Sequence, residues 1–529
     1  MESTFMARQH ATLAKPDLFP VPHTSPSRPK RRSGRVSLPS PNRLLSISVK
    51  SVRSEIIGVD GRGVKEDKES ARPGPVPIFV GLPLDSVSNS NKPNHARAIS
   101  AGLRALKLLG ADGVELPVWW SAVYSSPGRS TAPDWSAYLS LARTVRDAGL
   151  RLRVSLNPYG PGRNVGTARF GLPEWVETIS EADPDILFTD RVGNRRRDCL
   201  SFAVDELPVL AGKTPMAAFE EFFSGFLDAF GELIGTTVTD VSVGLGPGGE
   251  LRYPSFPPTE AKGRNFTGVG EFQCYDKYSL AALKKHAEEA GNPLWGLSGP
   301  HDAPEYSQSP AAAGFFKDGG GSWESPYGDF FLSWYSGQLL AHGDRLLGLA
   351  SKVFGHLPMT LSAKIPLLHC WHDTRSRPAQ LAAGYYNSEG RDGYDSVAEM
   401  FARNSCRMVV PGVDLADRDV PVGLRSSPES LLSQIAEACG RHGVRMAGEN
   451  SRLGGSDLGR ARENLSMLDS FVRSRRGCRW PVRTARCKQC KEGVVSENML
   501  ECSSAEIPIP RVCLCVRRYV CNGSFILVL

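Results

Sequence analysis

"VTDVSVGLGPGGELRYPSFPP" spans residues 238–258 and joins a β-branched run to a glycine-rich turn. Gly244, Gly246 and Gly249 have the G-x-G-x-x-G spacing that cradles a pyrophosphate in dinucleotide-binding folds. Such a loop needs a following helix, whose N-terminal N–H groups point at the phosphate. The three prolines that end this stretch disfavour a helix, because proline lacks an N–H and restricts the residue before it. The glycines therefore do not predict a nucleotide site.

The same stretch predicts a β-strand over 238–245 whose turn presents Glu250. Parallel barrels carry their catalytic groups in this way, at the carboxyl ends of the strands. Glu250 is therefore the first candidate catalytic residue.

From Val76 onward, short apolar strands alternate with amphipathic helices. Six further strands are predicted at 76–84, 112–120, 151–157, 359–371, 405–415 and 443–450. Helices are predicted at 95–110, 135–150, 218–235, 276–291 and 329–355. Strands separated by helices are typical of a parallel sheet with right-handed crossovers. We predict an α/β fold, a (β/α)8 TIM-type barrel with long loops at the carboxyl ends of its strands.

The net charge of +7 is unevenly distributed. Residues 1–53 carry ten lysines and arginines against two acids, and residues 473–529 carry eleven against four, so 54–472 have a net charge of −8. The basic ends thus do not indicate a nucleic-acid partner. No apolar run approaches the roughly 18 residues of a membrane span. We therefore expect neither a nucleic-acid nor a membrane partner.

The N-terminal segment is rich in Ser, Pro and Arg and contains "SPSRPKRRSGR" (25–35). This composition resembles an organelle transit peptide, and a basic tail or a nuclear signal remain as alternatives. We predict a transit peptide and linker at 1–70, a barrel at 71–472, and location in the chloroplast stroma.

The last part of the chain differs in composition from the barrel. Seven of the 12 cysteines lie in the last 52 residues, where Cys487 and Cys490 form a C-x-x-C. A zinc module is one interpretation. The other is a sequence unrelated to the fold, such as a shifted reading frame or a retained intron would produce. Because residues 473–529 show neither strand nor helix periodicity, we predict that they stay outside the fold and that the eighth barrel unit is missing.

A second carboxylate, Glu449 in "MAGEN", ends the seventh predicted strand. Glu250 and Glu449 would then both lie at the barrel mouth. Two carboxylic acids so placed suit glycoside hydrolysis, in which one protonates the leaving oxygen and the other activates water. A strand-end glutamate that only forms a salt bridge is the alternative for each.

Three stretches, "GLGPGGELRYPS" (244–255), "GVGEFQCYDKYSL" (268–280) and "LAAGYYN" (381–387), closely resemble the plant β-amylases of glycoside hydrolase family 14. The similarity runs over about three quarters of the chain and is strongest to chloroplast members that have lost catalytic-loop residues. It implies inverting exo-hydrolysis of α-1,4-glucans, releasing maltose, with no cofactor and no metal.

The resemblance assigns roles residue by residue. Glu250 matches the family's general acid and Glu449 its general base. Lys364 and His369, in "AKIPLLHCW", match a pair of sugar-binding residues, and Asn450 and Ser451 match glucan contacts beside the base. Without the resemblance, a core Lys–carboxylate pair and a buried imidazole would be the simpler interpretation of Lys364 and His369.

Several family residues that bind sugar are replaced. Pro117 in "LPVWW" stands where the family has a sugar-binding Asp. The lid "NPYGPGRNVGT" (157–167) lacks the family's His and has Thr167 in place of its Asp, and Pro411 replaces a Thr of an inner loop. At roughly 1–3 kcal/mol for each hydrogen bond to sugar, the loss corresponds to several orders of magnitude in rate.

We therefore predict a β-amylase-like protein of starch metabolism that binds α-1,4-glucan, with weak or lost activity and a glucan-binding or regulatory role. Active β-amylases or other starch enzymes are its expected protein partners. A fully active β-amylase is the first alternative. An unrelated barrel isomerase or dehydratase is the second, although the strand ends carry no metal-ligand cluster.

Overall fold

The computed structural model describes residues 77–88, 90–124, 133–161, 170–256, 268–450 and 527–528. The chain divides into two compact units, Met1–Ser70 and Ala71–Leu529, and every described residue belongs to the second. The predicted transit peptide and linker therefore lie outside the described residues, as do most of the lid and residues 451–526.

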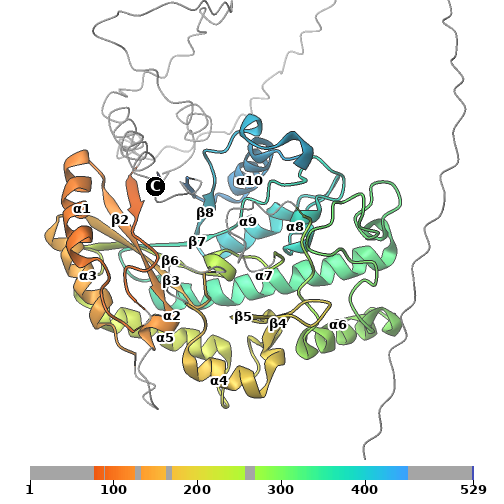
Figure 1. Ribbon diagram of the computed structural model, residues 1–529, viewed down its shortest axis with the longest axis horizontal. Helices are drawn as coiled ribbons and strands as arrows, with labels where there is room; N and C mark the ends of the chain where they lie inside the picture. The colour runs from red at the N-terminus through yellow and green to blue at the C-terminus, as the bar shows by residue number, and fades with distance from the viewer. Residues whose placement is uncertain are drawn as a thin grey trace, which may run out of the picture. The chain divides into compact units, whose positions relative to one another are not determined.

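Eight parallel strands form a closed barrel in the order β1-β10-β9-β8-β7-β6-β3-β2. Figure 1 labels β2, β3, β6, β7 and β8 of this sheet. Their bounds are β1 Ile78–Gly81, β2 Gly113–Trp119, β3 Arg151–Asn157, β6 Val238–Val243, β7 Thr360–Lys364, β8 Arg407–Pro411, β9 Met446–Glu449 and β10 Leu527–Val528. The predicted (β/α)8 fold class is confirmed, and all seven predicted strands are present, although β7 ends seven residues before the predicted limit.

The eighth position of the barrel is occupied, contrary to the prediction from sequence. Leu527 pairs with Ile78 of β1 and Gly448 of β9, and Val528 pairs with Phe79 and Glu449. The expectation that nothing after about residue 474 enters the fold is therefore wrong for these two residues. The physical reason is that β1 and β9 would otherwise leave open edges, which a short apolar strand can pair.

The strands place most of their apolar side chains outward, and their inward positions carry both charged and apolar residues. In β2, Val114, Leu116 and Val118 belong to the main core between strands and helices, whereas the alternate residue Glu115 faces the barrel interior and contacts β7. This alternation follows from the two-residue period of a strand. A separate small apolar cluster fills part of the interior, made by Phe79, Val409 and Ala447.

Ten α-helices are present among the described residues. They are α1 Ala96–Leu109, α2 Trp120–Val123, α3 Ser136–Asp147, α4 Glu174–Ala182, α5 Pro215–Phe230, α6 Lys277–Glu289, α7 Pro326–Phe354, α8 Pro378–Ala382, α9 Gly393–Arg403 and α10 Pro428–His442. The longest, α7, begins where the Ser325 side chain accepts from Gly328 N and Pro326 occupies the first turn. None of these helices combines the length and apolar character needed to cross a membrane.

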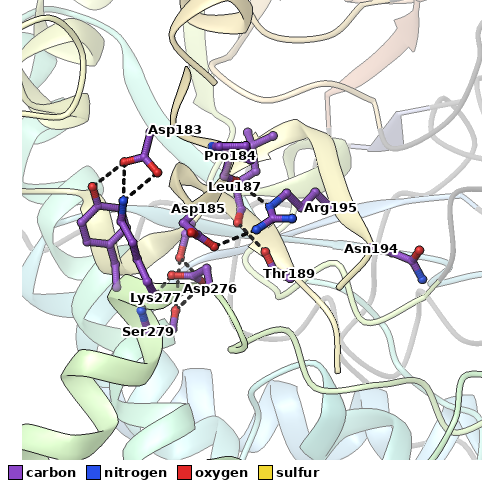
Figure 2. Close-up of polar contacts among 12 residues, drawn as sticks. Asp183, Pro184, Asp185, Leu187, Thr189, Asn194, Arg195, Asp276, Lys277 and Ser279 are labelled. Atoms are coloured by element: carbon purple, nitrogen blue, oxygen red, sulfur yellow. Dashed lines mark hydrogen bonds and ion pairs between the residues drawn. The ribbon is translucent and has the colours of Figure 1, made fainter. Parts of the chain in front are cut away.

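A two-stranded antiparallel hairpin, β4 Leu187–Thr189 and β5 Arg195–Leu200, lies outside the barrel sheet. Figure 2 shows the polar contacts around it. Arg195 binds Asp185 at 2.9 Å. Lys277, at the start of α6, binds Asp183 at 2.8 Å. These contacts join the segment before the hairpin to the hairpin itself and to α6. The sequence patterns did not predict this element.

Asp276 begins α6 as a buried N-cap residue (Figure 2). Its Oδ1 accepts from Ser279 N at 2.8 Å, and its Oδ2 accepts from Ser279 Oγ at 2.7 Å and Ser201 Oγ at 3.1 Å. Burial raises the pKa of Asp276 from 3.8 to about 6, although these hydrogen bonds oppose the shift.

We expect Asp276→Asn to remove a pH dependence of stability. Between about pH 4 and about pH 6 the folded carboxyl keeps a proton that the unfolded carboxyl has released. The free energy of unfolding therefore falls as pH rises through this range, by about 3 kcal/mol in total. Asn keeps the oxygen that accepts from Ser279 but does not titrate. Urea unfolding at about pH 5 and pH 7 should show a smaller fall for the variant, and equal falls would contradict this role.

Candidate active site

The turn after β6 fixes Glu250 at the carboxyl end of the barrel. A short 3-10 helix, η4 Pro247–Gly249, leads directly to Glu250, which has extended backbone. A side chain at Gly246 would lie 2.6 Å from the Glu250 carbonyl oxygen, and Gly249 has a φ of +83°. These glycines are required by the turn itself. Residues 251–256 form no helix, so the glycine motif presents a carboxylate rather than a phosphate site.

A buried histidine of α7 holds the beginning of this turn. His342 Nε2 lies 2.9 Å from the Leu245 carbonyl oxygen, and its Nδ1 lies 2.8 Å from Asp205 Oδ2. The Phe202 ring stacks on the imidazole with centroids 3.8 Å apart. Arg345 also donates to Asp205, at 2.8 Å. The segment that carries Glu250 is therefore anchored to α7 through a buried polar network.

Glu250 itself is partly exposed and lies beside the end of β7. Its side chain is 24% exposed, and Arg252 Nε donates to its Oε2 at 2.8 Å. The backbones of Glu250 and Lys364 form an isolated parallel β-bridge, and Leu251 N donates to the Lys364 carbonyl oxygen at 2.9 Å. The predicted acid therefore lies next to a predicted sugar-binding residue.

Lys364 and Glu449 meet in the barrel interior. Lys364 Nζ lies 2.7 Å from Glu449 Oε1 and 3.4 Å from Glu115 Oε1. Burial raises the pKa of Glu449 above its ordinary value, Lys364 opposes this rise and Glu115 adds to it. Burial lowers the pKa of Lys364, but Glu115 and Glu449 outweigh burial and raise it overall. The ammonium is therefore charged and shared between two carboxylates.

The other predicted site residues have separate surroundings. His369 Nδ1 lies 2.6 Å from Ser426 Oγ, and burial lowers the pKa of the imidazole. Asn450 follows Glu449 and is buried, and neither of its amide atoms has a hydrogen-bond partner within the part of the chain that the structure describes. Ser451 lies outside that part. A buried amide without partners is what a bound polar ligand would satisfy.

Two of the replaced family positions lie at the same end of the barrel. Pro117 is in β2, and Pro411 ends β8, where it pairs in register with Glu449. Asn157, the first residue of the predicted lid, turns its Nδ2 to the Ser155 carbonyl oxygen at 2.9 Å. Thr167 lies outside the described residues. Neither proline offers a polar side chain to the site.

Glu115 and Arg153 were not among the predicted site residues. They face each other in the register of β2 and β3, and Arg153 Nη1 lies 3.6 Å from Glu115 Oε2. The signal in β2 was a single charged residue in the otherwise apolar run "GVELPVW". Strand β3, "RLRVSLN", gave a weaker signal, because it also contains Arg151, Ser155 and Asn157.

Among the described residues, no group of three or more His, Cys, Asp or Glu side chains could hold a metal ion. The five described cysteines, Cys199, Cys274, Cys370, Cys406 and Cys439, are free thiols. Cys487 and Cys490, on which the zinc interpretation rests, lie outside the described residues.

The chain is similar to known proteins of one family. Residues 79–467 match the model of glycosyl hydrolase family 14. Inactive beta-amylase 9 of Arabidopsis thaliana is 50% identical over 406 residues, 76% of this chain and 74% of that protein. Chloroplastic beta-amylase 1 of the same plant is 42% identical over 391 residues, 74% and 67% of the two chains.

A solved structure has the same fold. The catalytic domain of beta-amylase from Paenibacillus polymyxa aligns with a TM-score of 0.58 and 26% identity, covering 74% of this chain and 90% of that one. The family match and the two plant relatives confirm the resemblance found in the sequence. The chain belongs to glycosyl hydrolase family 14.

Proposed function

We propose that this protein binds α-1,4-glucan at the mouth of its barrel and hydrolyses it weakly or not at all. The observation that carries the proposal is the placement of Glu250 and Glu449 at the ends of β6 and β9, linked through Lys364. The backbone of Lys364 forms a β-bridge with Glu250, and its side-chain ammonium binds Glu449 at 2.7 Å.

In the family reaction, Glu250 would protonate the glycosidic oxygen and Glu449 would activate the water that attacks the sugar. Among the described residues the amide of Asn450, next to Glu449, has no hydrogen-bond partner, and this supports a polar ligand at this position. A sugar hydroxyl supplies both a donor and an acceptor, which an amide needs.

Two observations support weak turnover. Pro117 and Pro411 place rings where the family has polar side chains that hold sugar. Burial and Glu115 raise the pKa of Glu449, the proposed base, so this carboxyl is more readily protonated and less available to accept a proton from water. The similarity to a plant protein named an inactive beta-amylase supports the same conclusion.

A fully active β-amylase remains the second candidate, because relatives about 40% identical bear that name. An unrelated barrel isomerase or dehydratase is set aside by the family match. A protein that binds glucan and hydrolyses it weakly or not at all would act as a glucan sensor or as a regulator of active starch enzymes.

Glucan binding can be tested by electrophoresis of the full chain in native gels with and without amylopectin. We expect amylopectin to retard the protein, and Asn450→Ala to weaken the retardation about tenfold in apparent Kd, because one hydrogen-bonding side chain is lost. Asn292→Ala, at an exposed position outside the site, is the matched control. Migration that does not depend on amylopectin would contradict the proposal.

We also propose that the protein works in the plastid stroma. The Arg- and Ser-rich N-terminal segment and several chloroplastic relatives support this location. Import of the radiolabelled full chain into isolated chloroplasts, with shortening of the product, is the expected result. Accumulation of the uncut chain outside the organelle would contradict it.

A further inference from the structure

Four charged side chains form a continuous row inside the barrel. Lys364 Nζ lies 2.7 Å from Glu449 Oε1 and 3.4 Å from Glu115 Oε1. On its other side Glu115 Oε2 lies 3.6 Å from Arg153 Nη1. Arg153 Nη2 in turn donates to Ser362 Oγ at 3.0 Å. Glu115 and Glu449 both lie beside the Lys364 ammonium and share it as a cation.

Glu115 lies deeper in the barrel than the position that carries Pro117. The two lie two positions apart in β2, with Leu116 between them, and therefore share one face of that strand. The Glu115 side chain is 7% exposed and that of Arg153 is fully buried. The Glu115 carboxylate of β2 thus contacts Lys364 from the barrel interior, farther from the carboxyl ends of the strands than Pro117.

This arrangement occupies two of the three donors of Lys364. An ammonium has three N–H groups, and two of them face carboxylates here. An ammonium–carboxylate hydrogen bond is roughly twice as strong as one between neutral groups. A sugar hydroxyl that approaches Lys364 must therefore compete with Glu115 and Glu449 for two of the three donors.

We propose that Glu115, supported by Arg153, is an internal ligand of Lys364 that holds the ammonium away from glucan and so limits glucan binding and turnover. The inference rests on the proposed function and adds a positioning residue to its site. Glu115 acts through Lys364 and does not itself touch the sugar.

The titration of the two carboxyls is consistent with this role. Burial raises the pKa of Glu115, but Lys364 and then Arg153 outweigh burial and hold it below its ordinary value. The pKa of Glu449 is raised, because burial and Glu115 together exceed the effect of Lys364. Glu115 therefore keeps its negative charge while Glu449, the proposed base, is more easily protonated.

The test is the double variant Glu115→Gln/Arg153→Met. It removes both ends of a buried pair, so the net charge is unchanged and no charge is left without its partner. Maltotetraose affinity is measured by isothermal titration, and maltose release is followed from about pH 5 to pH 8. We expect affinity to rise about tenfold, and the acid limb of any activity to move to lower pH as Glu449 becomes easier to ionise.

Asp240→Asn/Arg407→Met is the matched control. Arg407 Nη1 lies 3.0 Å from Asp240 Oδ1, and both side chains are buried inside the same barrel. The control therefore loses a comparable ion pair that does not include Lys364 or Glu449. Thermal unfolding and circular dichroism of each variant show whether it is folded. Loss of packing alone lowers affinity in both variants, whereas release of Lys364 raises it only in the first.

The outcomes separate the two proposals. Stronger binding by Glu115→Gln/Arg153→Met than by the parent and the control supports the inference, even where the parent does not bind measurably. If the parent binds maltotetraose and the double variant binds it equally or more weakly, the inference is overturned and the proposed function stands. Absence of binding by all three folded proteins overturns both.

Discussion

Replacing Lys364 by methionine is expected to lower the free energy of unfolding at neutral pH by about 3–5 kcal/mol, the cost of breaking a buried ion pair from one side. The substitution leaves Glu115 and Glu449 without the ammonium that both contact. Within the described part of the chain, Arg153 would then be left to offset two buried negative charges, and its nearest nitrogen lies 3.6 Å from Glu115. Methionine fills nearly the same space, so the loss reports charge rather than volume.

The effect of Lys364→Met should depend on pH in a defined direction. Without the cation both carboxyls are disfavoured as anions, so their folded pKa values rise above the unfolded ones. The folded state then binds more protons, and the free energy of unfolding falls as pH rises. The deficit relative to the parent should therefore be smaller at about pH 5 than at about pH 8 in guanidinium unfolding.

Lys352→Met is the matched control for this prediction. Lys352 binds Glu220 at 2.6 Å, but the two side chains are 69% and 40% exposed. Exposed pairs contribute roughly 0–1 kcal/mol. Similar small losses for both variants would show that the interior ion row does not stabilise the barrel.

Deleting Leu527–Leu529 is expected to destabilise the barrel by several kcal/mol and to make the chain associate. Leu527 and Val528 pair with β1 on one side and with β9 on the other. Each backbone hydrogen bond lost contributes about 1 kcal/mol net. Two neighbouring strands would also become open edges, which pair readily with other chains.

The deletion is compared with Leu527→Val/Val528→Ile, which keeps two apolar residues suited to a strand. We expect a lower unfolding midpoint and larger species in size-exclusion chromatography for the deletion alone. An unchanged midpoint would mean that the last residues are dispensable, as the composition of the tail had suggested.

The barrel was predictable because its strands are short apolar runs bounded by clear helix signals. The bounds of β2, β3 and β6 lie within two residues of the predicted ranges. The predicted strand at 359–371 was too long, because Pro366 interrupts the apolar run soon after Lys364 ends β7. The hairpin β4–β5 was missed, since its second strand begins with three arginines and has no apolar alternation.

The closing strand was missed for a different reason. Leu527–Val528 is only two residues long and lies far in sequence from both of its partners. A local pattern cannot reveal such a pairing, since what defines it is the open edge of the rest of the barrel. The run "FILVL" (525–529) is apolar throughout, so it has no alternation that would indicate a strand.

Part of the candidate site was also predicted from the sequence, and part was not. Glu250 and Glu449 were predicted at strand ends, and the structure places both there. The alternative for Lys364, a Lys–carboxylate pair in the core, describes its contacts in the structure. Glu115 and Lys364 are 249 residues apart in sequence. Only closure of the barrel brings them together, so no motif could have shown that they share an ion row.

Maltose release and glucan binding measured on the same preparation test the central claim most directly. The full chain is incubated with soluble starch beside an active plant β-amylase and its own Glu250→Gln variant, and maltoheptaose binding is measured by titration. We predict binding by the chain and a rate at least about 100-fold below the active enzyme, as the loss of two or more sugar contacts implies. Release at a rate close to that of the active enzyme, abolished in Glu250→Gln, would contradict the claim.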